Sequence, residues 1–127
     1  MSIRLGLAAL TSFALAGCVS TPPPLAEGPA RLGQLVYAGG PRVRPVSLVE
    51  DSRCPMNARC VWAGRAIVRA EVILGSGTRT LDLTLGEPVP VADGQLTLVS
   101  VTPDRMAGDP KPDPADYRFA FAFAGGL

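Results

Sequence analysis

Histidine is absent from the 127 residues of this chain, which removes the commonest general base and metal ligand of proteins. Ser-His-Asp catalysis, Cys-His catalysis and His-containing zinc sites are therefore excluded. An excess of charge is lacking as well, because 12 basic residues stand against 11 acidic ones. Without a basic surface there is no electrostatic footprint for nucleic acid, and we predict no nucleic-acid partner and no cofactor.

Long hydrophobic runs are also missing. The N-terminal run at residues 5–16 has about a dozen residues, too few to span a hydrocarbon core of about 30 Å as a helix. It follows a single cation, Arg4, and this arrangement predicts a removable signal peptide at residues 1–17. An N-terminal helix buried in the domain is the structural alternative.

The residues Leu15-Ala16-Gly17-Cys18 resemble the lipobox of bacterial lipoproteins at every position. This resemblance implies attachment of several acyl chains to Cys18, which hold a protein stably at a membrane. By the same resemblance Val19, where an Asp would retain the protein at the inner membrane, favours the periplasmic face of the outer membrane. An ordinary secretory signal is the alternative. Removal of residues 1–17 takes away Arg4 and leaves 11 basic and 11 acidic residues.

Cysteine is scarce, with three residues in the whole chain. If Cys18 carries lipid, Cys54 and Cys60 form an even pair in a compartment where disulfides persist, and we predict that they are bonded. Closing so short a loop contributes roughly 2 to 3 kcal/mol on the chain-entropy estimate. The spacing does not match a thioredoxin-like redox motif, and a zinc site here would lack two ligands.

The chain after the lipobox divides into a tether and one domain. Residues 18–30 are rich in proline and small residues, which favours an extended, semi-rigid spacer. Residues 31–127 predict a single small domain, of a size at which burial is marginal and a disulfide helps.

Apolar residues recur with a period of two through most of this domain, as in strands with one buried face. Short turn sequences separate the runs, including Gly39-Gly40-Pro41, Gly75-Ser76-Gly77 and the hairpin dipeptide Asp93-Gly94. The expected strands lie at residues 33–38, 43–50, 60–74, 78–85, 89–92, 95–101 and 117–123. Six or seven short strands without a helical pattern predict an all-β antiparallel sandwich, roughly immunoglobulin-like, with a partly open barrel as the alternative.

The last expected strand gathers four aromatic residues on one face. Such a stripe suits a ligand platform, but a strand that closes a small sandwich needs the same residues to fill its core, so we predict a core role. These residues are Tyr117, Phe119, Phe121 and Phe123.

Residues 51–64 resemble a signature of small bacterial lipoproteins and secreted proteins whose function is uncharacterised. The resemblance rests on Asp51-Ser52-Arg53-Cys54-Pro55, then Cys60, then Trp62-Ala63-Gly64, and it implies no activity. From the residues themselves we predict that Asp51 pairs with Arg53 or caps nearby N–H groups. Trp62 is expected on the inward face beside the disulfide, where an indole centres the core of many sandwiches.

The loop from Cys54 to Cys60 has either a structural role or a recognition role. In the second case its rigidity preorganises it for a partner, and the displayed candidates are Arg53, Met56, Asn57 and Arg59. We predict a lipid-anchored, non-enzymatic module that contacts an envelope component through this loop. An inhibitor of a periplasmic or host hydrolase is a more specific version, and a purely structural lipoprotein is a further alternative.

The segment Pro103–Asp116 is too long and proline-rich for a simple turn, and we expect a mobile edge loop or a partner loop. Its four aspartates lack the spacing of a calcium loop, so no metal site is predicted. Carboxylate-based hydrolysis is the one enzymatic route left without histidine. It would use Asp51 with a second acid that the sequence does not identify.

Overall fold

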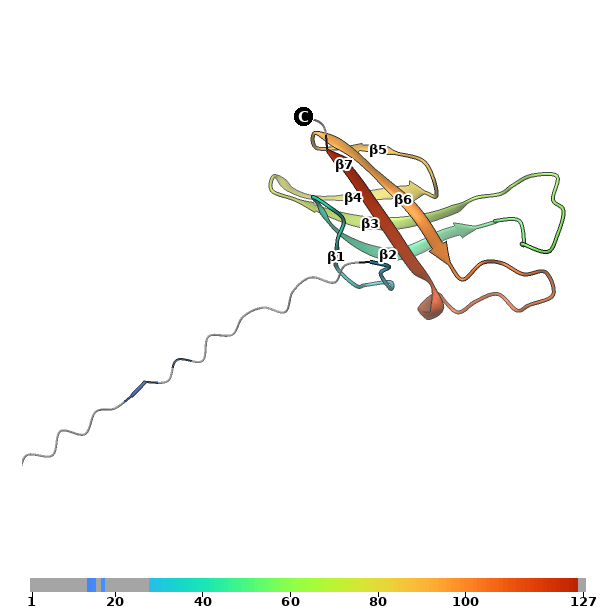
Figure 1. Ribbon diagram of the computed structural model, residues 1–127, viewed down its shortest axis with the longest axis horizontal. Coiled ribbons are helices and arrows are strands. Elements are labelled where there is room, and N and C mark those ends of the chain that lie inside the picture. Colours follow the sequence, from blue (N-terminus) through green and yellow to red (C-terminus); the bar gives the residue numbers. More distant parts are fainter. Residues whose placement is uncertain (1–13, 16, 18–27, 126–127) are drawn as a thin grey trace, which may run out of the picture.

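The computed structural model describes residues 14–15, 17 and 28–125, and two antiparallel sheets make up about half of this part (Figure 1). One sheet has the order β1-β2-β3-β4 and the other the order β5-β6-β7. The predicted all-β antiparallel sandwich is therefore confirmed. The elements are β1 (Val36–Tyr37), β2 (Arg42–Asp51), β3 (Ala66–Leu74), β4 (Gly77–Thr84), β5 (Val89–Val91), β6 (Gly94–Thr102), the single 3₁₀ turn η1 (Pro114–Asp116) and β7 (Arg118–Gly125).

Within each sheet, consecutive strands are neighbours, and the chain passes from the first sheet to the second between β4 and β5. A bridge between Leu85 and Leu98 joins the sheets near this crossing. Immunoglobulin domains have Greek-key connections instead, so the likeness to them stops at the two-layer architecture. No helix in the described part of the chain is long and apolar enough to cross a bilayer.

The core lies between the two sheets and follows the predicted period of two. β3 buries the side chains of Ala66, Val68, Ala70 and Val72 on one face. On the other sheet Tyr117 and Phe119 are fully buried with their rings stacked 6.1 Å apart, which confirms the core role of the aromatic stripe. Phe121 and Phe123 pack against the same cluster and are partly buried.

The prediction that one strand runs from Cys60 to Leu74 is wrong, because β3 begins only at Ala66. Backbone hydrogen bonds with the segment after β2 continue as far as Ala63, but two features of residues 60–65 interrupt the regular strand. Cys60 is bonded back to Cys54, and Gly64 has a left-handed φ of 67°. In the sequence, the alternating pattern continues through residues 60–64. In the structure these residues are exposed and form no buried face.

A smaller correction concerns the second hairpin. Val91 pairs with Gly94, so the two loop residues are Ala92 and Asp93, and Ala92 has a φ of 51°. The expected dipeptide, Asp93-Gly94, is displaced by one position, although the hairpin itself is confirmed.

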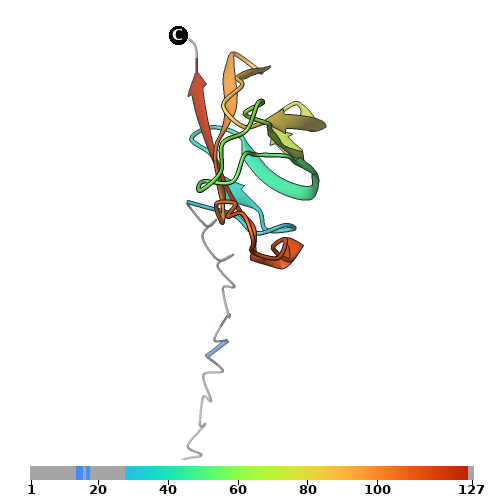
Figure 2. The same cartoon turned by 90° about the vertical axis from the view of Figure 1, so that its right-hand side faces the viewer.

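One end of the sandwich carries the two long connections. The segment between β2 and β3 and the segment between β6 and η1 project side by side from it (Figure 1), and Figure 2 views the molecule from this end. The described chain enters at the same end, where Ala30 and Phe119 exchange two backbone hydrogen bonds of 2.7 and 2.8 Å. Cys18 lies outside the described residues, as do most of the predicted signal peptide and tether, and these assignments stay predictions.

Candidate interaction site

The connection between β2 and β3, residues 52–65, is here called the stapled loop. Its predicted disulfide is confirmed, with the Cα atoms of Cys54 and Cys60 5.9 Å apart. Its base is held by backbone bonds from Ser52 N to Arg65 O at 2.8 Å and from Cys54 N to Ala63 O at 3.0 Å. The Ser52 hydroxyl also donates to the Arg65 carbonyl and accepts a bond from the Arg65 N–H. The two sides of the loop are therefore joined at more than one position.

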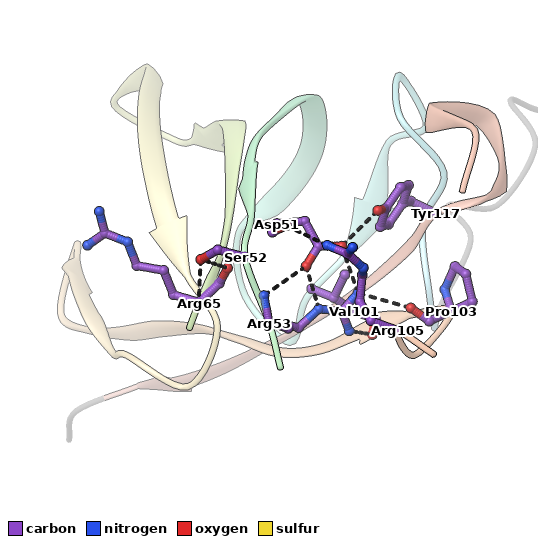
Figure 3. A network of polar contacts seen from close by, with 8 residues as sticks. All are labelled: Asp51, Ser52, Arg53, Arg65, Val101, Pro103, Arg105 and Tyr117. Atoms are coloured by element: carbon purple, nitrogen blue, oxygen red, sulfur yellow. Dashed lines mark hydrogen bonds and ion pairs between the residues drawn. The ribbon is translucent and has the colours of Figure 1, made fainter. Parts of the chain in front are cut away.

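The buried carboxylate of Asp51, the last residue of β2, lies at the base of this loop, and Figure 3 shows the side chains around it. Asp51 has no exposed side-chain surface, and both of its oxygens accept hydrogen bonds. Arg53 Nε donates to Oδ1 at 2.8 Å, and Arg53 Nη2 donates to Oδ2 at 3.0 Å. The Tyr117 hydroxyl donates to Oδ2 at 2.7 Å. The predicted pairing of Asp51 with Arg53 is confirmed, whereas the bond from Tyr117 has no signal in the sequence.

The guanidinium groups of Arg53 and Arg105 extend this network to the second sheet. Arg53 donates to the carbonyls of Val101 and Pro103 at 2.8 and 2.9 Å. Arg105 donates to the Asp51 carbonyl at 2.9 Å. The prediction that Arg53 is displayed for a partner is wrong, since only 13% of its side chain is exposed and its donors are used inside the protein. Arg53 instead fixes the base of the stapled loop to the end of β6.

Electrostatics in this network favour the ionised carboxylate and the neutral phenol. Burial alone would raise the pKa of Asp51, but the hydrogen bonds from Arg53 and Tyr117 and the charge of Arg53 outweigh it and lower that pKa below its ordinary 3.8. Burial, the bond to Asp51 and the carboxylate's charge raise the pKa of Tyr117 to about 12. Asp51 is therefore a structural anion at neutral pH, and Tyr117 is its donor.

The raised pKa of Tyr117 predicts a loss of stability at alkaline pH. The folded state holds the phenol proton more tightly than the unfolded state, so this contribution is present below pH 10 and is lost as the pH rises towards about 12. We expect the free energy of unfolding to fall over this interval in a Tyr37→Phe background, where Tyr117 is the remaining tyrosine. Denaturant unfolding at a series of pH values measures it, and an equal fall after Tyr117→Phe would contradict the assignment.

The proline-rich segment 103–116 rests against the stapled loop. Met56 N donates to Arg105 O at 2.7 Å, and the Asn57 side chain exchanges bonds with the backbone of Ala107 at 2.7 and 3.4 Å. Asn57 therefore fastens the two loops together, and it is also exposed, as expected of a displayed residue. In the described part of the chain, the aspartates of the proline-rich segment included, no three His, Cys, Asp or Glu side chains come together as a group that could hold a metal ion.

The outer half of the stapled loop exposes large apolar side chains. Trp62 is 82% exposed and Val61 91%, and Met56 on the other half is 70% exposed. The prediction that Trp62 packs into the core is thus wrong. Arg59 is exposed, as expected of a contact residue. We call Met56, Arg59, Val61 and Trp62 the tip. Gly64, two residues after Trp62, has a left-handed φ of 67°, and no sequence pattern by itself places the indole outside.

Two hollows border this region. The larger, of about 550 Å³, lies between the bulged part of β2 and residues 111–114, and it is lined by Leu32, Val46, Leu48 and the ring of Tyr117. The smaller, of about 280 Å³, lies beside Met56, Val99 and Arg105. In the larger hollow the Tyr117 hydroxyl is already bonded to Asp51, and the remaining lining is mainly apolar. The same hollow is also lined by one basic residue, Lys111, and one acidic residue, Asp113.

Comparison of the chain with protein-family models, with curated proteins and with solved structures gives no match in any of the three.

Proposed function

We propose that this protein is a lipid-anchored envelope protein that acts as a non-enzymatic binding module through its stapled loop. The observation that carries the proposal is the exposure of Val61 and Trp62 on a loop whose base is fixed. Tryptophan and arginine are enriched among the residues that dominate binding energy, and a preorganised loop loses little conformational entropy on binding. The lipobox resemblance of Leu15–Cys18 supports the anchor, and Val19 supports the outer membrane with the domain in the periplasm.

A hydrolase that uses Asp51 receives little support from this geometry. Its two oxygens already accept four hydrogen bonds, and its side chain has no exposed surface. A general acid or base must reach the reacting group directly or through one water. Asp51 is better explained as the buried counter-ion of Arg53.

Site-specific photo-crosslinking in intact cells tests the proposed function. A photoreactive residue at position 61, which is exposed, should give one reproducible crosslinked product. The same residue at Arg79, an exposed position on β4, is the control and should not give that product. A product that contains a hydrolase would specify the inhibitor version. Absence of a product from position 61, or the same product from both positions, would contradict a specific contact through the tip.

The contribution of the indole is tested by Trp62→Ala in the crosslinking strain. A truncated hot-spot residue weakens binding by about 2 kcal/mol or more, so we expect the yield of product to fall at least tenfold. The thermal midpoint of unfolding should hardly change, because the side chain is 82% exposed. An unchanged yield would remove Trp62 from the contact.

A further inference from the structure

The outer end of the stapled loop carries positive charge and no negative charge. Between Cys54 and Gly64 the sequence has one charged residue, Arg59, and no acid. Val61 and Trp62 follow within three positions and are almost fully exposed. An indole with an apolar body and a polar N–H suits the headgroup level of a bilayer, and an arginine beside it is attracted to anionic lipid.

Acidic residues are close to a different part of the loop. Asp104 and Asp109 belong to the proline-rich segment, which bonds to the stapled loop through Met56 and Asn57. Within the described residues no hydrogen bond joins that segment to residues 59–64. Val61 and Trp62 therefore lie on the half of the loop that is not hydrogen-bonded to the acidic segment.

The point where the chain enters the domain brings a bilayer within range. Ala30 pairs with Phe119, Phe119 pairs with Val101, and the Val101 carbonyl accepts a bond from Arg53 at the base of the stapled loop. A lipid-bearing Cys18 would be ten residues from Gly28, a distance of about 35 Å at full extension. A connection of this length keeps the point of entry into the domain within about 35 Å of the membrane that would hold the anchor.

We infer that Val61 and Trp62 insert into the headgroup region of a bilayer containing anionic phospholipid, with Arg59 bound to the lipid phosphates. The inference rests on the proposed function and identifies the envelope component as the bilayer itself. Because the disulfide and Asp51 already order the loop, insertion requires no further folding.

The single tryptophan of the chain reports on this contact directly. The mature lipidated protein is reconstituted into vesicles of phosphatidylcholine alone, or of phosphatidylcholine with phosphatidylglycerol, each with and without brominated acyl chains. We expect Trp62 emission to shift to shorter wavelength and to be quenched by brominated lipid in the anionic vesicles, with much less change in the neutral ones. Equal quenching in both, or none in either, would overturn the inference.

Two variants and a matched control complete the test. Val61→Asp should abolish the quenching, and Arg59→Gln should lower the ratio of quenched to unquenched Trp62 about fivefold, the effect of one cation at an anionic surface. Arg79→Gln makes the same charge change at an exposed site on β4 and should have no effect; an effect as large as that of Arg59→Gln would overturn the inference. A cooperative thermal unfolding transition like that of the wild type confirms that each variant is folded.

The outcomes separate this inference from the proposed function. If the protein does not associate with vesicles at all, the lipid anchor fails, and both are overturned. If it associates, gives a protein crosslink from position 61 in cells and shows unquenched Trp62, only the bilayer contact is overturned.

Discussion

Replacing Asp51 with alanine is expected to lower the free energy of unfolding by about 3 to 5 kcal/mol, the usual result of removing one partner of a buried ion pair. The change leaves Arg53, whose side chain is only 13% exposed, without its anion, and it leaves the buried Tyr117 hydroxyl without an acceptor. Denaturant unfolding at neutral pH measures the loss.

The matched control is Asp82→Ala, because Asp82 also pairs with an arginine, at 2.9 Å, but both side chains are about half exposed. Exposed pairs contribute little, so we expect almost no change in that variant. Equal effects of the two substitutions would contradict the buried counter-ion role. Acid supplies a second check, since a lowered pKa means that the contribution of Asp51 is present above pH 3.8 and is lost as the pH falls through its folded value. The difference in the free energy of unfolding between the wild type and Asp51→Ala should therefore decrease below pH 4.

Gly64→Ala is expected to destabilise the protein by about 3 kcal/mol and to open the base of the stapled loop. Gly64 has a φ of 67°, which disfavours a residue with a Cβ by about 1 to 2 kcal/mol. A Cβ there would also overlap the backbone carbonyl of Ser52, and relief of such overpacking costs a further 1 to 3 kcal/mol or so.

Gly86→Ala separates these two effects. Gly86 has a similar φ of 83°, but a Cβ at this position meets nothing within 4 Å. This variant should be destabilised only by the left-handed φ, which costs about 1 to 2 kcal/mol of the free energy of unfolding. If Gly64→Ala is no more destabilising than Gly86→Ala, the close approach of Ser52 to Gly64 is not a constraint on the loop.

The sequence predicts the layers of this protein well because its strands have one buried face. The alternation in residues 66–74 and the aromatic stripe at the end of the chain are both set by burial, and burial produces a period of two. The disulfide is predicted because two cysteines remain once Cys18 is assigned to lipid. The pair Asp51–Arg53 is predicted because two opposite charges lie two positions apart at a turn. Each of these features depends on residues close in sequence or on a simple periodicity.

The candidate site is harder to predict because long-range contacts define it. Asp51 bonds to Tyr117 across 66 positions of the chain, and Asn57 bonds to Ala107 across 50. No local pattern encodes either contact. The prediction for Trp62 is wrong for the same reason. In the sequence, an apolar residue in phase with a strand looks the same as one that follows a disulfide turn. The exposed tip therefore becomes visible only once the backbone of Gly64 is known.

The central claim is that a fixed loop base presents the tip in one conformation. Backbone amide relaxation of the oxidised protein tests it most directly. We predict order parameters near 0.8 for residues 56–64, close to the value of about 0.85 for rigid backbone, and a clear decrease after Cys54→Ser with Cys60→Ser. Values below about 0.6 across the loop in the oxidised protein would contradict the account, because the tip would then be flexible.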